Sequence, residues 1–91
     1  MKGLYLFQWD CGRMGDLEGI FIADSADVES LIGKNVYFGE VLGKHSEIEG
    51  VIENGDIALK TDDPAFIADL EKHLGTGTLS GHNPLDYIER D

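Results

Sequence analysis

Apolar positions recur along this chain with the spacing of short β-strands. The five strand-like stretches are residues 3–9, 17–23, 36–42, 46–52 and 56–60. The first is apolar on both faces, which is typical of a central strand covered on both sides. The dipeptide Asn54-Gly55 is the strongest hairpin signal in the chain. We therefore expect the last three stretches to form an antiparallel meander.

Two further stretches have helical spacing. The first begins at Asp24-Ser25, either of which can cap it, and ends before Gly33. The second begins at Asp63-Pro64 and ends at Gly75. Its expected buried stripe is Phe66, Ile67, Leu70 and Leu74. With a last short strand in residues 76–82, the pattern predicts a single α+β domain over residues 1–91. We expect an antiparallel sheet of about five strands, with two helices packed on one face.

Charge separates this chain from nucleic-acid and membrane binders. It has 91 residues, with 18 acidic and seven basic side chains, and a net charge of −11. Such a surface repels phosphate backbones and anionic lipids, so we expect neither direct nucleic-acid nor membrane contact. The acids can keep the protein soluble, face a basic protein partner or bind a cation. Cys11 is the only cysteine, which excludes an internal disulfide and favours a reducing cytoplasm.

The polar connection between the third and fourth strands is the strongest candidate site. It places Lys44, His45 and Ser46 in a row, in a chain with few bases. Arg13 lies in the loop between the first two strands, which is longer than a hairpin requires. Together these four residues would form an electropositive pocket for a small anionic ligand. Gly39 and Gly50, inside strands, suggest bulges or a close approach by another group.

Alternative chemistries use neighbouring residues. His45, Glu47 and Glu49 share one strand face, but three ligands on a flat strand rarely converge on one metal ion. We therefore expect no metal and no cofactor. His45 could instead act as a base oriented by Glu40 or Glu47. Cys11 would be a nucleophile only if Arg13 and His45 lowered its pKa, and a lone cysteine is more often a small packed hydrophobe.

Two segments resemble a family of small uncharacterised proteins from bacterial and phage genomes. They are residues 12–19, GRMGDLEG, and residues 36–47, VYFGEVLGKHSE. They cover less than a quarter of the chain, and the second segment is the more specific. The resemblance implies no activity and no catalytic residues. It implies only that the Arg13 loop and the His45 turn belong together.

Three functions follow from these patterns. The first is a non-catalytic acidic binding protein that holds a small anionic ligand or a partner protein at Arg13, Lys44, His45 and Ser46. The second is an acidic inhibitor or nucleic-acid mimic, of a kind used by phages, that binds a basic host protein. The third is a small His-dependent hydrolase or transferase. A homodimer would also cover apolar surface that a core this small cannot.

The His45 hypothesis has a direct test. His45→Ala should leave the melting temperature unchanged, because a turn accepts almost any polar residue there. The same change should abolish stabilisation by an anionic ligand. A thermal-shift comparison of wild type and mutant against nucleotides, phosphorylated metabolites and divalent metals measures both effects. An equal response of the two proteins would contradict the hypothesis.

Overall fold

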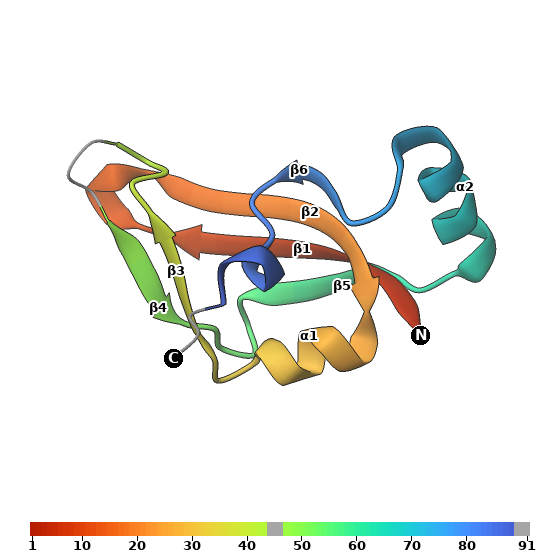
Figure 1. Ribbon diagram of the computed structural model, residues 1–91, viewed down its shortest axis with the longest axis horizontal. Helices are drawn as coiled ribbons and strands as arrows, with labels where there is room; N and C mark the ends of the chain where they lie inside the picture. Colours follow the sequence, from red (N-terminus) through yellow and green to blue (C-terminus); the bar gives the residue numbers. More distant parts are fainter. Residues whose placement is uncertain (44–46, 89–91) are drawn as a thin grey trace.

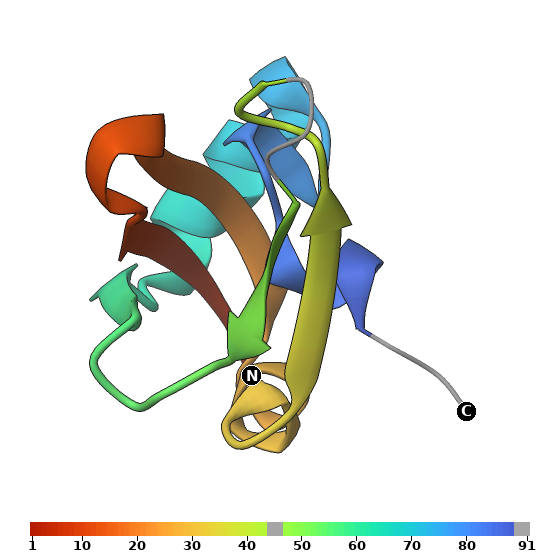
Figure 2. The same cartoon turned by 90° about the vertical axis from the view of Figure 1, so that its left-hand side faces the viewer.

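The computed structural model describes residues 1–43 and 47–88, and it contains two antiparallel sheets (Figure 1). The main sheet has the strand order β5-β1-β2-β6. Its strands are β1 (Lys2–Asp10), β2 (Asp16–Asp24), β5 (Ile57–Thr61) and β6 (Thr78–Gly81). The strands β3 (Asn35–Gly39) and β4 (Ile48–Val51) pair with each other as a two-stranded ribbon. Viewed from its end of the molecule, the ribbon stands in front of the main sheet (Figure 2).

Two helices and two 3₁₀ turns complete the described fold, which confirms the α+β class. The elements are α1 (Ser25–Leu31), α2 (Pro64–Leu74), η1 (Gly12–Met14) and η2 (Pro84–Tyr87). Both helices begin at the expected acidic caps. Asp24 accepts a hydrogen bond from the Ala26 N–H, and Asp63 accepts one from the Ala65 N–H. Neither helix has the length and apolar character needed to cross a membrane within the described residues.

The expected meander of the last three strands is wrong in one pairing. Asn54-Gly55 does form a turn, but β5 pairs with β1 and not with β4. The Asp56 carboxylate accepts the Glu53 N–H at 2.8 Å, and the Glu53 carbonyl accepts the Asp56 N–H at 3.0 Å. This turn leads the chain away from the ribbon. Strand β1 then gains a partner on each edge, as a strand with two apolar faces requires.

The core lies between one face of the main sheet, the ribbon and α1. Its most deeply buried side chains are Phe7, Leu17, Phe21, Leu31, Val36 and Ile52. Phe38 of the ribbon packs among the rings of the core, with centroids at 5.6 Å from Phe7, 5.5 Å from Trp9 and 4.6 Å from Tyr87. These contacts join the ribbon to the main sheet, because the two sheets share no strand pairing among the described residues.

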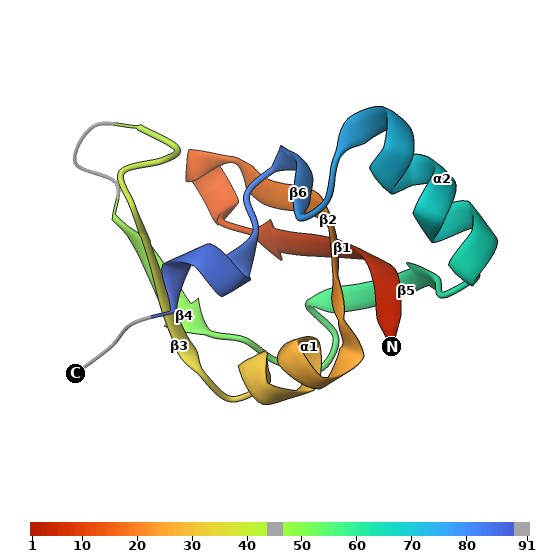
Figure 3. The same cartoon turned by 45° about the vertical axis from the view of Figure 1, so that its right-hand side comes forward.

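Helix α2 differs from the expected arrangement. It lies at the opposite end of the molecule from the ribbon (Figure 3). Its Glu71 pairs with Lys2 at 2.8 Å, and Lys2 belongs to the β1 face that points away from Phe7. The two helices therefore cover different faces of the sheet. Only Ile67 of the expected stripe is fully buried, whereas Phe66 is 47% exposed and Leu74 65% exposed. A single helix resting on the end of a sheet buries a narrow stripe.

The last strand, β6, pairs with β2, and the chain that follows it passes over β2 at two glycines that lie opposite each other. Gly19 pairs with Gly81, which has φ of +70°. A Cβ at Gly19 would collide with the carbonyl oxygen of His82, and one at Gly81 with that of Glu18. The His82 N–H donates to the Glu18 carbonyl at 3.0 Å. The absence of side chains here lets the C-terminal segment lie on the core and bring Tyr87 to Phe38.

Gly19→Ala should therefore destabilise the protein, by about 1–3 kcal/mol or more, because the methyl group displaces backbone. Gly55→Ala is the matched control, since a Cβ at Gly55 meets no atom within 4 Å. It should change the free energy of unfolding by less than about 0.5 kcal/mol. Urea denaturation of the two variants measures both values. Equal stability of the two variants would contradict this account of the crossing.

Candidate functional site

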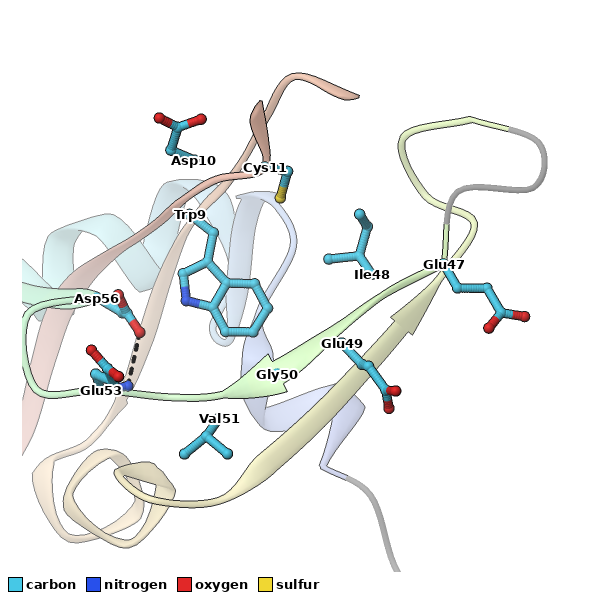
Figure 4. A pocket seen from close by; sticks show the side chains of 10 residues that line it. All are labelled: Trp9, Asp10, Cys11, Glu47, Ile48, Glu49, Gly50, Val51, Glu53 and Asp56. Carbon is cyan, nitrogen blue, oxygen red and sulfur yellow. Dashed lines mark hydrogen bonds between the residues drawn. The ribbon is translucent and has the colours of Figure 1, made fainter. Parts of the chain in front are cut away.

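A groove of about 410 Å³ lies between β4 and the end of β1 (Figure 4). Its lining residues are Trp9, Asp10, Cys11, Glu47, Ile48, Glu49, Gly50, Val51, Glu53 and Asp56. Five of these ten carry carboxylates, and none is Lys, Arg or His. The groove therefore has acidic residues along an aromatic and aliphatic surface, and the side chains of Glu47 and Glu49 point away from Trp9 (Figure 4).

Trp9 lies in the middle of this groove. Its indole is held edge-on by Phe7 at 5.3 Å and Phe38 at 5.5 Å. On the ribbon side it faces Gly50, where an added Cβ would lie 3.4 Å from the ring. The side chain is half-buried. A bound group can therefore reach an indole whose orientation the core already fixes.

The carboxylates are spread along the groove and are not gathered at one point. Glu53 and Asp56 lie at one end and Glu47 at the other, with Trp9 between them (Figure 4). Asp10 accepts a hydrogen bond from the Gly12 N–H at 2.8 Å. Among residues 1–43 and 47–88, no three His, Cys, Asp or Glu side chains are placed to hold a metal ion. None of the ion pairs seen between these residues involves a groove carboxylate.

The negative potential also extends to the outer face of the ribbon. Tyr37 of β3 lies opposite Glu49 of β4. Desolvation raises the pKa of the Tyr37 hydroxyl, as do the charge of Glu47, a hydrogen bond to the Glu47 side chain, and the charges of Glu49 and Glu40. Ionised tyrosine is disfavoured here because it would add a further negative charge to this group of acids.

Cys11 lies at the rim of the groove in a setting that disfavours the thiolate. Burial, followed by the charges of Asp10 and Asp16, raises the pKa of its thiol. An activated cysteine needs the opposite environment, with a nearby cation or a helix N-terminus. The described surroundings of Cys11 therefore do not support a nucleophilic role.

The structure brings together some of the residues singled out from sequence and separates others. Cys11 and Glu47 both line the groove. Arg13 is exposed in η1, and Glu40 is exposed just after β3. Neither lines the groove. The other candidates, Lys44, His45 and Ser46, lie outside the described residues.

Sequence reasoning missed most of the groove. Trp9 was expected only as part of the first strand and Asp56 as the first residue of the fifth, and no role was assigned to Glu53. One signal did point here, because Gly50 was expected to mark a close approach, and Trp9 fills that space. Gly39 likewise marks the expected bulge, at a shift in the β3–β4 register.

No protein-family model, no curated protein and no solved structure matches this chain. The resemblance of residues 12–19 and 36–47 to small bacterial and phage proteins thus stays a prediction.

The Cys11 environment predicts slow alkylation. The rate of reaction with iodoacetamide should rise with pH around a midpoint above that of free cysteine. Asp16→Asn should lower this midpoint, because it removes a negative charge that opposes the thiolate. Glu18→Gln, on the same strand, should leave it in place. A midpoint below that of free cysteine would mean that Cys11 is an activated thiol.

Proposed function

We propose that this protein is a non-catalytic binding protein whose groove holds a positively charged segment of a protein partner. The observation that carries this proposal is a groove around a half-buried tryptophan, with five carboxylates and no cation among its described lining residues. Covering carboxylates that form no ion pair among the described residues is unfavourable unless the bound group brings positive charge. Lysine and arginine side chains supply that charge.

Trp9 adds a reason to prefer a protein segment over a free cation. The indole presents apolar surface that the side chains of a protein segment can cover, whereas a hydrated free cation cannot. The spacing of the acids along the groove also suits several charges carried on one chain. A single divalent ion would need three or more ligands at one point, and the described residues do not provide them.

The anionic-ligand hypothesis depends on Arg13, which does not line the groove, and on residues outside the described ranges. Arg13 follows Trp9 and Cys11 in the sequence, and its side chain is exposed. Its expected partners, Lys44, His45 and Ser46, are not among the described residues. The anionic ligand therefore remains a hypothesis that rests on sequence, whereas the basic partner is supported by described geometry. The hydrolase alternative depends in the same way on His45.

A lysine- and arginine-rich peptide should bind to this protein with an affinity that falls as salt is raised. The double variant Glu49→Gln/Glu53→Gln should weaken binding about fivefold, at roughly 0.5 kcal/mol for each exposed charge pair. Isothermal titration calorimetry measures both effects. A glutamate-rich peptide of equal length is the ligand control.

The matched protein control removes the same charge elsewhere. Glu29→Gln/Asp62→Asn also deletes two exposed carboxylates, but neither residue lines the groove. It should retain wild-type affinity. Failure of the basic peptide to bind at low salt, or an equal loss in the two double variants, would overturn the proposed function.

A further inference from the structure

The groove follows the edge of β4. All five successive residues from Glu47 to Val51 line it. Side chains of a strand alternate between its two faces, so a groove on one face would touch only every second residue. A groove that touches every residue runs along the edge, where the backbone itself is exposed.

The hydrogen bonds of the ribbon indicate which backbone groups face this edge. The Ile52 N–H donates to the Lys34 carbonyl at 3.0 Å, and the Ile52 carbonyl accepts from the Gly33 N–H at 2.8 Å. Ile52 therefore directs both backbone groups toward the β3 side. In an antiparallel pair this direction alternates, so Val51 and Glu49 direct their N–H and C=O groups away from β3.

No strand of the described residues pairs with this edge, since β4 has β3 as its single neighbour. The other edge of the ribbon is different, because Val36 of β3 forms a bridge to Ile88. On the opposite wall, the Gln8 N–H donates to the Asp56 carbonyl at 3.0 Å. The strand β5 begins at Ile57, so beyond Gln8 the end of β1 has no β5 partner on that side.

We propose that the basic partner binds as an extended segment that adds an antiparallel strand to the free edge of β4. This inference rests on the proposed function and specifies how the groove is used. Main-chain hydrogen bonds to Glu49 and Val51 would supply affinity, and side-chain contacts would supply specificity. Five residues from Glu47 to Val51 match a partner segment of about five residues, roughly 17 Å long.

Strand addition also specifies the partner's sequence pattern. Residues of the added strand on the face of Glu47 and Glu49 meet carboxylates and should be lysine or arginine. Residues on the opposite face join Ile48 and Gly50 beside Trp9 and should be apolar. The partner is therefore a segment in which basic and apolar residues alternate. In antiparallel pairing, residues that hydrogen-bond to each other have their side chains on the same face of the sheet. The partner residues opposite Glu49 and Val51 are therefore the basic ones.

A second copy of this chain is a poorer occupant. Antiparallel pairing of two β4 edges would place Glu47 and Glu49 of one copy close to the same residues of the other. Like charges opposite one another destabilise a sheet. Both copies would also carry a net charge of −11.

The test uses a peptide of alternating lysine and valine, acetyl-Lys-Val-Lys-Val-Lys-Val-Lys-amide, and two N-methylated forms. Methylation of the internal lysine amides blocks the N–H groups expected to face β4, and should weaken binding about tenfold or more. Methylation of the valine amides blocks the groups that face solvent, and should change affinity little. All three peptides keep the same charge and side chains, so a purely electrostatic complex would not distinguish them.

Amide hydrogen exchange followed by NMR gives a second readout. Binding of the parent peptide should slow exchange at Glu49 and Val51 about tenfold, with no comparable change at Gly50, whose N–H already faces β3. Equal binding by the two methylated peptides, or a greater loss on valine methylation, would overturn strand addition while leaving the proposed function in place. Absence of binding by every basic peptide would overturn both. Dimerisation of the protein with protection of the same amides would instead assign the edge to a second copy.

Discussion

The packing of Phe38 among Phe7, Trp9 and Tyr87 determines where the ribbon lies. The two sheets share no hydrogen-bonded pair of strands among the described residues, so their relation depends on side-chain packing in the core. Phe38 contributes the central ring of that contact, and Trp9 is held by the same cluster. The groove exists because this packing brings the edge of β4 beside the end of β1 without pairing the two strands. Its geometry therefore depends on the aromatic core beneath it.

The C-terminal segment supports this arrangement from the other side. It crosses β2 at Gly19 and Gly81, where backbone lies directly on backbone, and then places Tyr87 on Phe38 and Ile88 beside Val36. One edge of the ribbon is thus covered by the chain itself. The other edge, β4, is left beside the groove. The asymmetry follows from the route of the chain and gives the ribbon one open side.

Local signals in the sequence predicted local structure well. Asp24 and Asp63 capped their helices as expected, because a cap depends on residues two or three positions away. The predicted meander was wrong because Asn54-Gly55 specifies a turn but not the strand with which the next segment pairs. That segment, β5, pairs with β1. The groove was missed for a similar reason. Alternation places Trp9 on the inner face of β1, but the arrival of Gly50 opposite it depends on packing between distant segments. Only the glycine itself marked that approach.

The carboxylates of β4 have a second consequence that bears on its open edge. An unpaired strand edge is a template for association with other chains, and proteins commonly protect such edges with charge. Here the protecting charge is negative. Glu47 and Glu49 repel another copy of this acidic protein, but they attract a lysine- or arginine-bearing strand. The proposed binding would also use Trp9, which lines the groove beside these acids. An open backbone edge, the acids along it and this tryptophan would together distinguish a selective binding edge from a merely protected one.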